Sequence, residues 1–142
     1  MDVEEFIKFL EVTFSNLSKD LDLKHMKLED IELKVAEKFQ DIDYQIFKAA
    51  YKNNPQEYMA FLVVFLMEPD KEISRKLWSL YSDLMYHYVS EAQEVAIVPM
   101  LLYFGEKKWQ PLPLAQLYSL SEQVPNFSFE FFDLLRSQHQ II

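Results

Sequence analysis

A single glycine, Gly105, is present in this chain of 142 residues. Tight hairpin turns and loops that wrap phosphate groups depend on residues that accept positive φ, and glycine does so at the lowest cost. A chain with one glycine is therefore expected to avoid hairpin-rich sheets and glycine-rich nucleotide loops. This scarcity favours helices as the dominant secondary structure.

Half of the residues are hydrophobic, 15% are aromatic and none is cysteine. One domain of this length buries roughly 68–70% of the surface of its unfolded chain, so we predict a single helical domain over 1–142. The lack of cysteine excludes disulfides and thiolate metal sites and fits a reducing compartment. With no secretory signal and no apolar run near the roughly 20 residues of a spanning helix, we expect a cytoplasmic protein without membrane contact.

The first 42 residues are predicted to form an antiparallel pair of helices. Asp2 and Glu5 have the spacing of a capping box. Apolar residues recur at helical intervals over 3–17, and again over 28–42 after a polar connection. We expect this acidic pair, residues 2–42, to pack on helices formed by residues 43–142.

Residues 58–67 form a ten-residue apolar run that follows a cap-like Asn54-Pro55. Asparagine, then proline, then Glu57 is typical of a helix start. A helix that is apolar on every side is expected to be surrounded by other helices. The run therefore predicts a central helix over about 55–67.

A buried strand is the alternative for the same run, because it contains Val63, Val64 and two phenylalanines. Its only candidate partner, residues 95–104, contains Pro99, which lacks the N–H that a strand ladder needs. The connecting segment, about 70–88, has the apolar spacing of a long helix. We favour the helical interpretation.

The remaining segments extend this pattern. We predict short helices over 43–51, 90–104 and 114–121, with Gly105 as the C-terminal cap of the second, and a last helix over about 128–138. The predicted fold is all-α: a compact single-domain bundle of about seven or eight helices, several of them short, around the central helix.

Catalytic motifs are absent from the sequence. It contains no glycine-rich nucleotide fingerprint, no nucleophile elbow and no pair of Glu-x-x-His sequences. We therefore predict no catalytic residues, no metal site and no cofactor, and expect that the chain is not an enzyme.

Acidic residues are concentrated near the start of the chain. The net charge is −9, and residues 1–43 contain 12 Asp and Glu against 6 Lys. Apolar side chains among acids resemble the anchor and rim of a protein interface. Six outward-pointing residues are candidates for binding a partner with a basic surface: Glu5, Phe9, Val12, Asp30, Glu37 and Asp41.

These features predict a noncatalytic, acidic protein-interaction module. Inhibitors, immunity proteins, antitoxins and nucleic-acid mimics use such charge to steer association. Direct nucleic-acid binding is not expected, because Lys107-Lys108 beside Trp109 is the only basic-aromatic cluster. The aromatic C-terminal helix is either core or the contact of a homodimer.

A small-molecule or cofactor-binding bundle is the alternative function. Its pocket would lie near His87, a histidine on the long helix that has Asp83 one turn before it. The candidate lining residues are Phe61, Phe65, Tyr81, Asp83, Met85, His87 and Tyr88.

Overall fold

The computed structural model describes residues 1–39, 42–118 and 125–142. These residues form a mixed six-stranded sheet in which strand order follows chain order, β1-β2-β3-β4-β5-β6. The strands are β1 (Lys27–Glu29), β2 (Asp43–Tyr51), β3 (Asn54–Leu66), β4 (Val95–Tyr103), β5 (Glu130–Asp133) and β6 (Gln138–Ile141). The prediction of an all-α bundle is therefore wrong.

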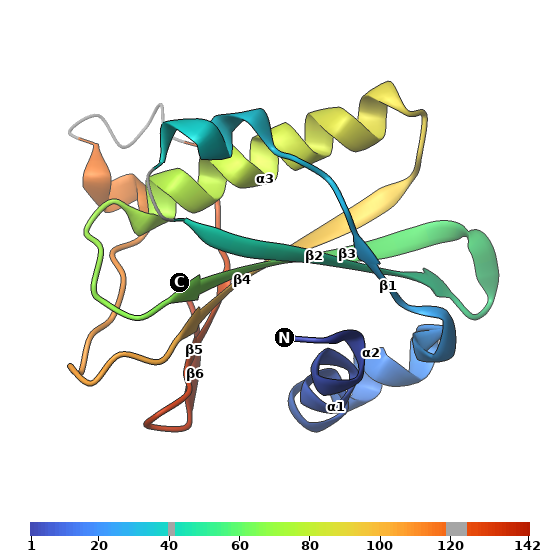
Figure 1. Ribbon diagram of the computed structural model, residues 1–142, viewed down its shortest axis with the longest axis horizontal. Coiled ribbons are helices and arrows are strands. Elements are labelled where there is room, and N and C mark those ends of the chain that lie inside the picture. The colour runs from blue at the N-terminus through green and yellow to red at the C-terminus, as the bar shows by residue number, and fades with distance from the viewer. Residues whose placement is uncertain (40–41, 119–124) are drawn as a thin grey trace.

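Helices cover both faces of this sheet (Figure 1). On one face α1 (Val3–Thr13) and α2 (Ser15–Asp20) pack together, and on the other lies the long α3 (Ile73–Ser90). Three short 3-10 turns, η1 (Leu23–His25), η2 (Lys34–Lys38) and η3 (Leu114–Leu117), complete the described elements.

The pairing of the strands changes from antiparallel to parallel at β3. Strands β1, β2 and β3 pair antiparallel, whereas β3, β4 and β5 run parallel to one another and β6 returns antiparallel. Helix α3 connects β3 to β4, as a parallel pair requires. The carboxyl ends of three neighbouring strands therefore meet at the same edge of the sheet.

Two helices were correctly predicted. The capping box at the start of α1 is present: the Glu5 amide donates to the Asp2 carboxylate at 2.8 Å, and the Asp2 amide donates to Glu5 at 3.2 Å. Helix α3 buries most of its predicted apolar face: Tyr81 is partly buried, and the fully buried members are Ile73, Leu77, Leu80, Leu84 and Tyr88. The capping box was sufficient to predict α1, and the stripe of apolar residues was sufficient to predict α3.

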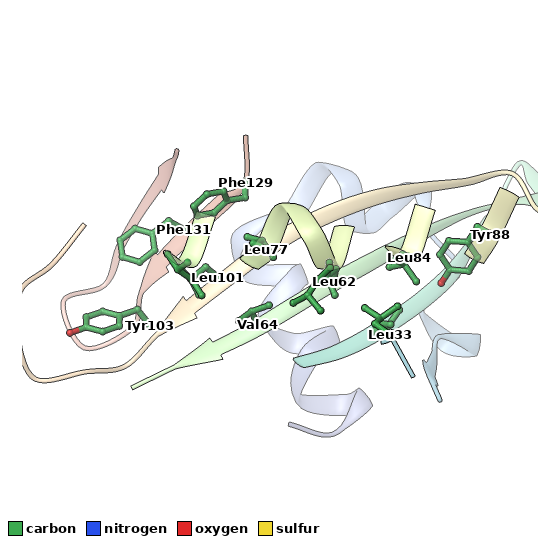
Figure 2. Close-up of a cluster of buried hydrophobic side chains, with 14 residues drawn as sticks. Leu33, Leu62, Val64, Leu77, Leu84, Tyr88, Leu101, Tyr103, Phe129 and Phe131 are labelled. Atoms are coloured by element: carbon green, nitrogen blue, oxygen red, sulfur yellow. The ribbon is translucent and has the colours of Figure 1, made fainter. Parts of the chain in front are cut away.

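The predicted central helix over 55–67 is instead the central strand β3. Ala60, Leu62 and Val64 face the α3 side, where they pack with Leu33, Leu77, Leu84 and Leu101 (Figure 2). Phe61 and Val63 face the other side, where they pack with residues of α1. A strand buried on both faces has no polar alternation, so its sequence resembles that of a buried helix.

Pro99 does not interrupt the pairing of β3 with β4, where it lies opposite Leu62. The Tyr58 amide donates to the Glu94 carbonyl and the Phe104 amide to the Leu66 carbonyl, so even-numbered residues of β4 direct their backbone groups toward β3. Pro99, at an odd position, directs its nitrogen away from β3. Its missing N–H therefore costs the central pairing nothing.

The scarcity of glycine did not exclude hairpins, because other residues form the turns. Ala92 follows α3 with φ 54° and Ser137 lies in the β5–β6 turn with φ 50°. The β2–β3 connection at 51–54 uses no residue of positive φ. A low glycine count therefore does not prevent a chain from forming a sheet with hairpins.

The other predicted helices are also corrected. Residues 28–39 include the end of β1 and the turn η2, residues 40–41 of the predicted helix lie outside the described residues, and residues 43–51 form strand β2. Gly105 follows strand β4 and caps no helix, and the predicted last helix over 128–138 is strand β5 and the turn before β6. The predicted C-terminal helix is therefore wrong, and a homodimer contact through these aromatic residues stays a prediction. None of the described helices is long and apolar enough to cross a membrane.

Candidate functional site

The edge at which the parallel strands end carries a cavity of about 910 Å³. In sheets with parallel strands, ligands commonly bind outside the carboxyl ends of the strands. Here β3 ends at Leu66, β4 at Tyr103 and β5 at Asp133. We call this edge the carboxyl edge; its cavity is lined by Met67, Glu68, Pro69, Tyr103, Phe104, Gly105, Glu106, Lys107 and Leu135.

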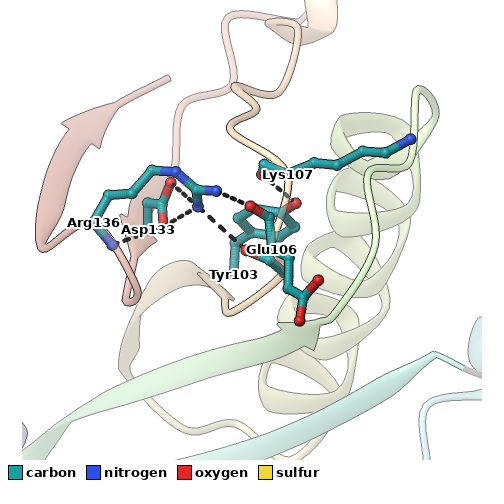
Figure 3. A network of polar contacts seen from close by, with 6 residues as sticks. Tyr103, Glu106, Lys107, Asp133 and Arg136 are labelled. Atoms are coloured by element: carbon teal, nitrogen blue, oxygen red, sulfur yellow. Dashed lines mark hydrogen bonds and ion pairs between the residues drawn. The ribbon is translucent and has the colours of Figure 1, made fainter.

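The loop after β4 is held in place by two side chains (Figure 3). The Arg136 guanidinium donates to the carbonyls of Gly105 and Glu106, and the Tyr103 hydroxyl donates to the Lys107 carbonyl at 2.7 Å. Three consecutive carbonyls of the loop are therefore bound. This fixes the backbone from which Lys107 extends.

Arg136 is itself positioned by Asp133. The guanidinium donates to both carboxylate oxygens of Asp133 at 3.1 Å, and the Arg136 amide donates to the same carboxylate. Asp133 is only 2% exposed, so its charge depends on this partner. The buried ion pair thus links the β5–β6 turn to the loop after β4.

Gly105 is required in this loop by lack of space. A Cβ at this position would overlap the Met67 carbonyl and the Tyr103 ring and hydroxyl. Glycine allows the loop to pass closely over the end of β3. Gly105 was predicted to cap a helix, whereas it follows strand β4.

The charged side chains at the carboxyl edge have mixed signs. Lys107 and Lys108 are exposed on the fixed loop, and Glu68 and Glu106 are exposed nearby. Trp109 is half-buried, with its ring 5.2 Å from that of Tyr103 and 6.0 Å from that of Phe131. The lysines face solvent, whereas the tryptophan belongs to the core.

A second polar cavity, of about 320 Å³, lies beside β1 and β2. Lys48 lines it and is ion-paired with Glu29 at 2.6 Å, and its ammonium lies 5.4 Å from the centre of the Tyr88 ring. The charge of Lys48 is therefore already compensated within the chain.

The six predicted partner-binding residues do not form one surface. Glu5 belongs to the cap of α1, Val12 is 83% exposed, and Phe9 packs edge-on against Phe132 with ring centres 4.9 Å apart. Asp30 is exposed between β1 and η2, and Glu37 is exposed within η2, a turn on the α3 side of the sheet, across it from α1 (Figure 1). Asp41 lies outside the described residues.

The residues of the predicted ligand pocket are divided by the sheet. Phe61 and Phe65 pack on the α1 side, whereas Tyr81 and Tyr88 pack on the α3 side. The Asp83 carboxylate accepts a hydrogen bond from the Val35 amide at 3.2 Å, not from His87. The His87 ring lies edge-on to that of Tyr88. Tyr81 and Met85 do line a common cavity, of about 520 Å³.

In 1–39, 42–118 and 125–142, no group of three or more His, Asp and Glu side chains is placed to hold a metal ion. At the carboxyl edge, the structure offers two exposed lysines on a fixed loop, a cavity and two exposed carboxylates.

The fold and this edge define a single-sheet α/β protein with its open cavity at the ends of parallel strands. A family model described as "Putative transposase, YhgA-like" matches residues 1–142, and the chain belongs to this family. No curated protein and no solved structure matches the chain. Family membership overturns the predicted inhibitor or antitoxin-type module, and also the alternative of a cofactor-binding helical bundle.

Proposed function

We propose that this chain acts on DNA, and that the carboxyl edge is the surface that meets it. Membership of a transposase-like family over the whole of 1–142 is the observation that carries this proposal. It replaces our sequence-based expectation that nucleic acid is not a partner. The expectation that the chain is not an enzyme stays a prediction.

Overall charge limits how such binding works. With a net charge of −9, the chain is repelled by DNA at long range, so contact depends on local cations. Lys107 and Lys108 supply two neighbouring ammonium groups. Because Arg136 and Tyr103 fix the loop, little backbone entropy is lost when these lysines meet phosphates.

The expected binding is weak and strongly salt-dependent. Each phosphate contact adds about 0.9 to the slope of log affinity against log salt for duplex DNA, so the Lys107→Gln, Lys108→Gln double variant should lower that slope by about 1.8. Fluorescence anisotropy of a labelled DNA duplex, measured from low to physiological salt, gives both affinity and slope.

A matched variant separates charge from position. Lys19→Gln with Lys24→Gln removes the same charge from exposed sites within α2 and η1. This control should keep the wild-type slope. Equal effects of the two double variants would remove the carboxyl edge from the proposal, and no DNA binding at low salt would remove the proposed function itself.

A further inference from the structure

Half of the β4 edge that faces β5 is unpaired in the described part of the chain. Pairing between β4 and β5 begins only at Met100 and Glu130. The Leu134 amide donates to the Tyr103 carbonyl, which shows that odd-numbered residues of β4 direct their backbone groups to this side. Val95 and Ile97 therefore present N–H and C=O groups beyond the paired region.

Pro99 separates the paired half of this edge from the open half. Its nitrogen faces the β5 side and carries no hydrogen, so it donates no bond to the chain that precedes Glu130. Ile97, Pro99 and the segment 126–129 line one cavity, of about 520 Å³. Where the two strands separate, the structure thus has a hollow rather than a continued ladder.

Aromatic side chains of α3 form the other side of this hollow. The rings of Trp78 and Tyr81 lie 5.9 Å apart with an interplanar angle of 21°. Phe127 packs against both, at 5.1 Å from Trp78 and 5.4 Å from Tyr81. Met85, 42% exposed, lines the cavity as well.

We propose that this cavity receives one unpaired nucleobase of a DNA strand, an inference that rests on the proposed action on DNA. Stacking on aromatic rings suits the flat face of any base. The N–H and C=O of Ile97 form a donor and an acceptor like those along the edge of a base, and the amide of Asn126, which also lines the cavity, adds another pair.

The two sites can share one strand. Ile97 and Tyr103 are six residues apart on β4, a distance of about 20 Å at the usual rise of a strand. About six nucleotides cover that distance at the duplex rise of about 3.4 Å each. A 12-nucleotide single strand is therefore long enough to reach both Lys107 and the cavity.

Tryptophan fluorescence reports on the cavity directly. The chain has two tryptophans, so Trp109→Phe leaves Trp78 as the only emitter. A stacked base quenches indole emission, so the 12-nucleotide single strand should quench Trp78, whereas a blunt duplex of the same sequence should not. Equal quenching by the two probes would overturn the proposal, because a duplex offers no unpaired base.

A pair of helix variants gives an independent measurement in the wild-type background. Met85→Glu places a carboxylate in the cavity wall, and Val89→Glu places one a turn later at a residue that is 70% exposed and does not line it. Loss of one stacked base should make the single-strand affinity of Met85→Glu about 5- to 150-fold lower than that of Val89→Glu.

The outcomes distinguish this inference from the proposed function. DNA binding that persists with unquenched Trp78 and with equal affinities of the two glutamate variants overturns the nucleobase site and leaves the proposed function intact. Absence of binding to both single-stranded and duplex DNA overturns both.

Discussion

Gly105 lies where the loop after β4 crosses the end of β3, and its requirement there is steric. The added methyl group of alanine would overlap a backbone carbonyl of Met67 and the Tyr103 side chain. Overpacking of this kind costs about 1–3 kcal/mol. The residue therefore determines how closely the loop can approach the sheet.

Gly105→Ala should accordingly lower the free energy of unfolding by about 1–3 kcal/mol. Urea denaturation followed by circular dichroism measures this change. Ala115→Gly, at an exposed position in η3, tests whether an alanine–glycine exchange alone has such an effect. A Gly105→Ala variant of wild-type stability would show that the loop can move away without cost.

Tyr88 is buried at 2% exposure, and its hydroxyl has no hydrogen-bond partner among the described residues. Desolvation, with a smaller contribution from Glu29, raises the pKa of this phenol well above its ordinary value. The folded protein therefore holds the phenol proton more tightly than the unfolded chain does. Above about pH 10, the ordinary tyrosine pKa, unfolding releases this proton, and the free energy of unfolding falls as pH rises.

Tyr88→Phe should remove that alkaline loss of stability. It should also stabilise the protein by about 1 kcal/mol at neutral pH, because an unsatisfied buried hydroxyl is deleted. Thermal unfolding measured from pH 7 to 11 tests both effects. Tyr86→Phe, on the same helix but 73% exposed, should leave the neutral-pH stability unchanged; a destabilised Tyr88→Phe variant would indicate that the hydroxyl has a partner.

At the scale of elements, the Asp133–Arg136 pair joins the β5–β6 turn to the loop after β4. Removing one partner of a buried ion pair leaves the other charge uncompensated, which costs about 3–5 kcal/mol. Arg136 is partly exposed, with 23% of its side chain accessible, so the low end of this range applies. The loop would also lose two of the donors that bind its carbonyls.

Arg136→Met is therefore expected to lower the free energy of unfolding by about 3 kcal/mol and to speed amide hydrogen exchange in residues 105–108. Arg136→Lys keeps the charge but not the forked donors, so its effect should be smaller. Unchanged exchange in Arg136→Met would mean that Tyr103 alone holds the loop.

Elements whose signals are local were predictable from the sequence. The cap at Asp2 and the stripe of α3 each lie within one segment, and both helices are present. Strand β3 was not predicted, because what distinguishes a buried strand from a buried helix is the partner on each side. That partner, β4, lies about 40 residues away in the sequence. It contains Pro99, and the sequence alone does not show that the nitrogen of this proline faces away from β3.

The candidate sites, like the strands, were predictable only where their signals are local. The sequence indicated Gly105, Lys107, Tyr81 and Met85 separately, but nothing in their spacing places Asp133 and Arg136 beside the loop after β4. These contacts depend on β5 lying parallel to β4, a long-range pairing that no local pattern encodes.

At the scale of the whole molecule, each strand pairs only with strands adjacent in sequence, and the two parallel pairings of β4, with β3 and with β5, separate two antiparallel groups. The acidic N-terminal part is continuous with this sheet through β1. The residues predicted to form a helical pair packed on the rest of the domain thus contribute to both faces of one sheet.

The contact between Phe9 and Phe132 joins the first helix to the fifth strand. During synthesis, α1 emerges from the ribosome more than one hundred residues before its aromatic neighbour. Until Phe132 is synthesised, part of the apolar face of the nascent sheet stays exposed to water and to chaperones. A product truncated before β5 would therefore keep α1 packed on β2 and β3 but would lack the contact that covers Phe9 at the other end of the sequence.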